Sequence, residues 1–149
     1  MLFRSRFLAV FIVASAVALV APALAAQRRT YFGPAAGGVN NAGVEISARL
    51  SNGKPFKITA FNWQNVPTSC TRNRGATTDQ FPKAIKVKDG AFQATGTIGT
   101  GTTVTVSGKF KHQNTKMAGK LRVHGNVPGC SGADTGTVSW TAKQPAGQR

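Results

Sequence analysis

Positively charged side chains far outnumber negatively charged ones in this 149-residue chain. Nineteen Lys and Arg residues stand against four Asp and Glu residues, which gives a net charge of +15. Several of these cations alternate with apolar residues, so an extended chain would turn them together toward its outward face. The candidate anion-binding residues are Lys57, Lys86, Lys88, Lys109, Lys111, Lys120 and Arg122, with Arg72 and Arg74 at the rim of a loop.

Two interpretations of this cationic face stay open. A solvated face of like charge would keep a secreted β-protein monomeric and would block pairing of exposed strands. A binding face would attract an anionic polymer such as nucleic acid, bound without sequence preference, or a cell-envelope surface, or an acidic protein. We expect a secreted, non-enzymatic module that binds an anionic polymer or an envelope surface.

Catalytic groups are poorly represented. The acidic residues are too scattered to offer a carboxylate pair for acid–base chemistry: they are Glu45, Asp79, Asp89 and Asp134. The two histidines, His112 and His124, are expected on opposite faces of neighbouring strands, roughly 20 Å apart, and so could not act on one substrate. We therefore expect no enzyme activity and no catalytic residue. A secreted hydrolase is the weaker alternative.

The cysteines predict a disulfide. Cys70 and Cys130 are the two cysteines of the chain, so one pairing is available. A bridge between them would close a loop of about 60 residues and stabilise the fold by about 4 kcal/mol in the chain-entropy model. Neither the cysteines nor the histidines have the close spacing of a structural zinc site. We expect no metal and no cofactor.

The first 25 residues predict export. Arg4 and Arg6 precede an apolar stretch over residues 7–20, and Ala23, Leu24 and Ala25 form a small-residue cleavage site. This order is typical of a secretory signal peptide, whereas a membrane-spanning helix needs about 20 apolar residues. We expect a mature chain in the periplasm or outside the cell, with no membrane span, where disulfides are stable.

Alternation of apolar and polar residues recurs along the rest of the chain and predicts an all-β protein. Residues 26–43 are rich in Gly and Asn and are expected to lead into the domain, with a short strand around Tyr31. Residues 44–149 are expected to form a single β domain. Seven or eight antiparallel strands would close as a β-sandwich or a flattened barrel.

Two strands near residues 102–124 allow a register prediction. The simplest pairing places Phe110 opposite Gly119 and Val106 opposite Val123, with a loop over residues 113–116. The same register sets Lys109 directly across from Lys120. Like charges that face each other in this way destabilise a strand pair.

Residues 55–62 are expected to place Phe56, Ile58 and Ala60 in the core. Phe61 and Trp63 have outward parity, yet we expect them in the core because the chain bends into an irregular stretch over residues 63–82. Trp140 has inward parity beside Val138. The 63–82 loop supports an alternative function, in which a structural or inhibitory protein docks an acidic protein partner.

The C-terminal part resembles a known group of proteins. The motifs are VSGKF at residues 106–110, AGKLRV at 118–123, CSG at 130–132 and TVSWTAK at 137–143. These motifs resemble those of small exported bacterial β-sandwich proteins of uncharacterised function. The resemblance implies a fold and an export route, and it implies no catalytic residue and no cofactor.

Overall fold

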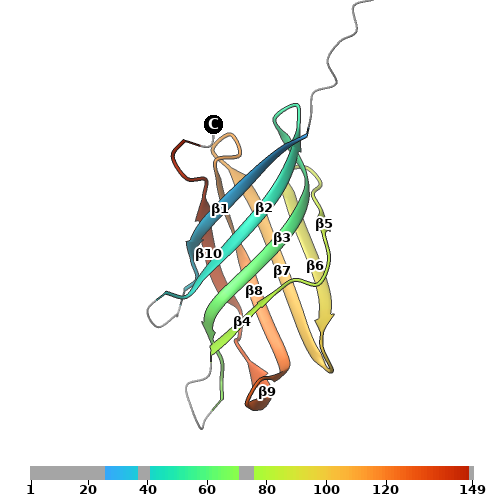
Figure 1. Cartoon of the computed structure of the whole chain (residues 1–149), viewed down its shortest axis with the longest axis vertical. Coiled ribbons are helices and arrows are strands. Elements are labelled where there is room, and N and C mark those ends of the chain that lie inside the picture. The colour runs from blue at the N-terminus through green and yellow to red at the C-terminus, as the bar shows by residue number, and fades with distance from the viewer. Residues whose placement is uncertain (1–25, 37–40, 71–75, 148–149) are drawn as a thin grey trace, which may run out of the picture.

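The computed structural model describes residues 26–36, 41–70 and 76–147 (Figure 1). The signal peptide expected in residues 1–25 lies outside the described residues. Within the described part, no helix is long and apolar enough to cross a membrane.

The described residues form one antiparallel sheet of ten strands that curls into a half-barrel (Figure 1). Eight strands follow the order β4-β3-β2-β1-β10-β8-β7-β6, while β5 pairs with β3 and β9 pairs with β8. The antiparallel all-β class predicted from the alternation is confirmed, with ten strands where seven or eight are expected. The strand bounds are β1 Gln27–Pro34, β2 Gly43–Ser51, β3 Lys54–Pro67, β4 Ala76–Gln80, β5 Ile85–Lys86, β6 Ala91–Ile98, β7 Thr102–Lys111, β8 Lys116–Val127, β9 Cys130–Asp134 and β10 Val138–Lys143.

The segment expected to lead into the domain supplies a central strand. β1 runs between β2 and β10 and joins the two halves of the sheet. Tyr31 is fully buried, and its hydroxyl donates a hydrogen bond of 2.7 Å to the carbonyl of Asn114. The short strand expected around this residue is therefore part of an eight-residue strand.

The core fills the inside of the curled sheet. Phe61 of β3 packs edge-on against Trp140 of β10, with ring centroids 5.4 Å apart, and Phe92 of β6 stacks beside Trp140. Space for these rings comes from Gly108, where a Cβ atom would lie 2.5 Å from the Phe92 ring and 2.8 Å from Trp140. The prediction that Trp140 belongs to the core is confirmed, since it is 2% exposed.

Two bulges in β3 change which of its side chains face the core. Ala48 of β2 pairs with Ile58 while Ser47 pairs with Ala60, so Thr59 is an extra residue; Phe56 is extra in the same way. The prediction that Phe56 faces inward is therefore wrong: its side chain is 40% exposed, and Ala60 is only partly buried. The bulge at Thr59 brings Phe61 and Trp63 inward, which confirms that both are core residues. The expectation of an irregular stretch over residues 63–82 is wrong in part, because β3 continues to Pro67 and β4 forms at Ala76–Gln80.

The register predicted for β7 and β8 is wrong by two residues. Phe110 pairs with Met117 and Val106 pairs with Leu121, while Lys109 lies opposite Ala118 rather than Lys120. The turn begins directly after Lys111, because His112, Gln113 and Asn114 all adopt left-handed backbone angles, with φ values of 49°, 55° and 64°. A shift of two residues preserves parity, so the lysines still point outward.

The half-barrel has two distinct ends (Figure 1). The hairpin end carries the turns at residues 52–53, 88–91 and 112–115, and the disulfide end carries β9 and the two cysteines. Hydrogen bonds join the turns of the hairpin end. Asn114 Nδ2 donates to the carbonyl of Gly53 at 2.9 Å, and the Phe110 amide donates to the carbonyl of Gly90 at 2.8 Å. The hairpin end is thus a connected platform.

Candidate anion-binding surface

Four cations line up across four neighbouring strands near the hairpin end. Arg28 of β1 pairs with Arg49 of β2, and Arg49 pairs with Lys57 of β3. Lys57 in turn pairs with Lys86 of β5. We call these residues the Arg–Lys row. All four are exposed on the outer face of the sheet.

The Arg–Lys row places like charges side by side. Neighbouring strands lie about 4.8 Å apart, so the row spans roughly 14 Å. Like charges directly opposite each other destabilise a sheet by up to about 1 kcal/mol per pair. Arg28 donates a hydrogen bond of 3.4 Å to the hydroxyl of Ser47. The ion pairs found within the described ranges involve none of these four cations.

A second line of cations crosses the other wall of the half-barrel. Lys143 of β10 pairs with Lys116 of β8, and Lys116 pairs with Lys111 of β7. We call these three residues the lysine row. Lys120 lies further from the hairpin end, between Ser107 and Ser139, and Lys109 lies between Ala118 and Ala91.

The structure thus divides the predicted cations between two walls. Lys57 and Lys86 lie on the wall of β1, β2, β3 and β5, with Lys88 in the adjoining turn at residues 88–91. Lys109, Lys111 and Lys120 lie on the wall of β10, β8 and β7, which runs behind the first wall in Figure 1. Curling of one sheet separates residues that share the same outward parity. Sequence reasoning missed Arg28, Arg49, Lys116 and Lys143, since only the strand register shows which cations are neighbours.

Arg122 has a carboxylate partner at the disulfide end. Its guanidinium donates two hydrogen bonds to Asp134, at 3.1 and 2.6 Å. Hydrogen bonds from Arg122 and from the Gly136 amide lower the pKa of Asp134 to about 2. His124 Nδ1 lies 3.6 Å from the same carboxylate. Arg122 is therefore already compensated, while Arg72 and Arg74 lie outside the described residues.

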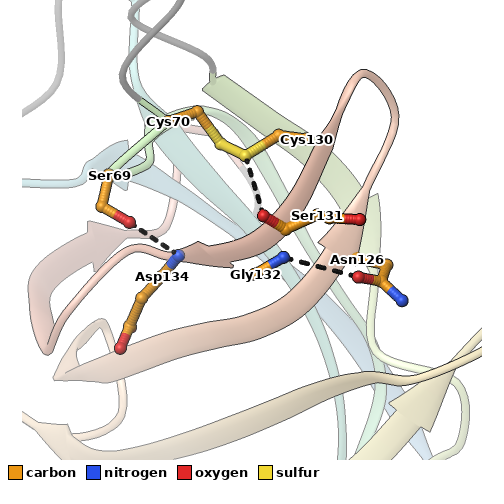
Figure 2. Close-up of a disulfide and its surroundings, with 7 residues drawn as sticks. All are labelled: Ser69, Cys70, Asn126, Cys130, Ser131, Gly132 and Asp134. Atoms are coloured by element: carbon orange, nitrogen blue, oxygen red, sulfur yellow. Dashed lines mark hydrogen bonds between the residues drawn. A yellow bond between two sulfur atoms is a disulfide. The ribbon is translucent and has the colours of Figure 1, made fainter.

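The predicted disulfide is present (Figure 2). Cys70 and Cys130 are joined, with their Cα atoms 6.1 Å apart. Two hydrogen bonds reinforce the bridge: the Ser69 amide donates to the Asp134 carbonyl at 2.8 Å, and the Asp134 amide donates to the Ser69 hydroxyl at 3.1 Å. These contacts fasten the chain beyond β3 to β9, and Cys130 begins that strand.

Two hollows on the outer face meet at Phe32, a residue that sequence reasoning did not select. The larger has a volume of about 680 Å³ and is bordered by Glu45, Asn62 and Gln80, among others. The smaller, of about 430 Å³, is bordered by the lysine row. Phe32 lines both hollows and is 44% exposed. Within the described ranges, no group of three His, Cys, Asp or Glu side chains could hold a metal ion.

Comparison with known proteins identified no relative of this chain. It matches no family model, no curated protein and no solved structure. The resemblance to small exported bacterial β-sandwich proteins therefore stays a prediction.

Proposed function

We propose that the protein is an exported, non-enzymatic module that binds an anionic polymer or an anionic envelope surface. The observation that carries the proposal is the Arg–Lys row, in which four cations from four strands lie directly opposite one another. Such a row opposes folding by mutual repulsion. A bound polyanion would remove that repulsion and would release the counterions condensed on the polymer.

The distribution of charge supports the same function. The full chain has a net charge of +15, to which Arg4 and Arg6 of the expected signal peptide contribute two, and the remaining positive charge creates a long-range field that attracts polyanions and accelerates their encounter. Asp134, by contrast, lies at the disulfide end with its own partner, Arg122. The cations of the Arg–Lys row and the lysine row both lie toward the hairpin end, so a polymer could contact both walls there.

The disulfide supports the proposed location. Structural disulfides persist in oxidising compartments such as the periplasm and the extracellular space. The bridge between Cys70 and Cys130 agrees with the signal sequence expected in residues 1–25. We propose that the exported chain folds as a flattened barrel, as the curled sheet suggests, and that its cationic surface faces the cell envelope or the medium.

The proposal is tested by removing two charges from the Arg–Lys row. Lys57→Gln with Lys86→Gln should weaken binding to single-stranded DNA and to heparin, and should reduce the log–log salt slope for the DNA by about one to two units. The matched control is Lys83→Gln with Lys120→Gln, which removes the same net charge from two other exposed lysines. Titrations at several salt concentrations measure the affinity and the salt slope of each double variant.

Equal losses in the two double variants would show that only net charge matters and would contradict a localised surface. Absence of binding at low salt by the wild-type protein would remove the proposal altogether. The expected result is a loss confined largely to the Lys57 and Lys86 variant.

A further inference from the structure

Phe32 lies at the centre of a longer cross-strand line on the outer face, which includes the lysine row. Its Cα partners are Glu45 of β2 on one side and Lys143 of β10 on the other. The two hollows that meet at this ring differ in chemistry. An apolar ring exposed between two differently charged hollows can contact a ligand that extends into both.

Amide and carboxylate groups occupy one side of Phe32. Glu45 pairs with Asn62, and Asn62 pairs with Gln80, so these three side chains continue the line across β2, β3 and β4. All three border the larger hollow. Amides both donate and accept hydrogen bonds, and carboxylates accept them. The buried Oδ1 of Asn62 accepts no hydrogen bond from any described residue.

Cations occupy the other side of Phe32. The lysine row continues the same line across β10, β8 and β7 and borders the smaller hollow. Ammonium groups donate hydrogen bonds and accept none, so this half selects for anionic groups. From β4 to β7 the line crosses seven strands, which corresponds to roughly 29 Å along the outer face.

We propose that this line, the Phe32 track, binds a linear acidic polysaccharide that contains both neutral and anionic sugars. A sugar packs its apolar face on the Phe32 ring. Hydroxyl and acetamido groups of a neutral sugar exchange hydrogen bonds with Glu45, Asn62 and Gln80, while a carboxylate or sulfate binds the lysine row. The inference rests on the proposed function and names the class of anionic polymer.

The carboxylates beside the track argue against nucleic acid as its ligand. A nucleic acid carries a negative charge at every nucleotide, so a strand that crossed Phe32 would bring phosphates next to Glu45 and Asp79, which both border the larger hollow. A polysaccharide with alternating charge can place a neutral unit there. Charge complementarity therefore favours the saccharide.

The test compares two exposed phenylalanines. Phe32→Ala should weaken binding of hyaluronan oligosaccharides, in which a uronate alternates with an N-acetylated sugar, by about tenfold, as expected for loss of a packed ring. Phe56→Ala is the matched control, because Phe56 is 40% exposed and belongs to neither hollow. Asn62→Ala should weaken hyaluronan binding and leave oligothymidine binding unchanged, and Lys116→Gln should weaken hyaluronan binding.

Equal hyaluronan affinities for the Phe32→Ala and Phe56→Ala variants would overturn the inference. So would a loss of oligothymidine binding on Phe32→Ala that exceeds the loss for hyaluronan, or binding of oligothymidine without any binding of hyaluronan. The proposed function would survive each of these results, because it fails only when polyanion binding is absent or when the Lys57 and Lys86 double variant loses no more affinity than its control. Amide fingerprint spectra of each variant establish that the fold is retained.

Discussion

Arg122 at the disulfide end donates two hydrogen bonds to Asp134, whereas Arg49 and Lys57 near the hairpin end face each other across neighbouring strands. The disulfide end combines a covalent bridge, paired backbone groups and a compensated charge. The hairpin end keeps like charges in register. Under the proposed function, the ion pair at the disulfide end stabilises the fold, while the Arg–Lys row bears a repulsive cost that a bound polyanion would offset.

Of the changes that test this difference between the two ends, removal of the disulfide should have the largest effect on the free energy of unfolding. Replacement of both cysteines, Cys70→Ser with Cys130→Ser, should lower the free energy of unfolding by about 4 kcal/mol. Polyanion affinity of the folded fraction should not change, because the bridge lies at the opposite end from the Arg–Lys row. Denaturant titration and heparin binding measure the two quantities. A folded variant that has lost heparin affinity would contradict the division of roles.

Tyr31 connects the central strand to the hairpin end, and its removal has the next largest effect. Tyr31→Phe deletes the hydroxyl that donates to the Asn114 carbonyl and should cost about 1 kcal/mol of unfolding free energy. Hydrogen exchange at residues 112–115 should accelerate more than exchange in β9. Equal acceleration at both ends would show that the hairpin end is not a separately fastened platform.

Asp134 makes the stability of the disulfide end depend on pH. Because its folded pKa is lowered from 3.8 to about 2, its stabilising contribution is present above pH 4 and is lost as the pH falls toward 2. Asp134→Asn should therefore lower stability at neutral pH by at most about 1 kcal/mol, since the pair is exposed, and should have little effect near pH 2. Thermal unfolding from pH 2 to 7 measures this difference. A constant difference at all pH values would contradict the ion-pair explanation.

The same regions show how much of this fold could be predicted from the sequence. Alternation in residues 102–112 predicts a strand and its outward lysines, and two cysteines allow one disulfide. The register was missed because three consecutive left-handed residues at 112–114 place the turn, and apolar alternation does not encode that turn. The extra residues Phe56 and Thr59 were missed because bulges leave no mark on composition.

The candidate surface depends on contacts between distant segments, so it was only partly predictable. Lys57 and Lys86 were selected by parity, yet their direct opposition requires the pairing of β3 with β5. Arg28 and Phe32 were overlooked because their segment was expected to lead into the domain. Both become neighbours of charged groups only when β1 enters the centre of the sheet.

Substitution of Lys57 has the smallest expected effect on the free energy of unfolding. The same substitution should also change heparin binding, so it links the two measurements. Lys57→Glu would place a carboxylate opposite Arg49 and Lys86, so attraction replaces repulsion. The free energy of unfolding should rise by a few tenths to about 1 kcal/mol without any ligand. A matched change, Lys83→Glu, introduces the same charge outside the row.

The most direct measurement is the free energy of unfolding of the wild type, Lys57→Glu and Lys83→Glu, each with and without heparin at low salt. A ligand that binds the folded state raises this free energy. We predict that Lys57→Glu is the most stable of the three without heparin and gains the least when heparin is added. Lower stability of Lys57→Glu without heparin, or an equal gain for all three proteins, would contradict the account.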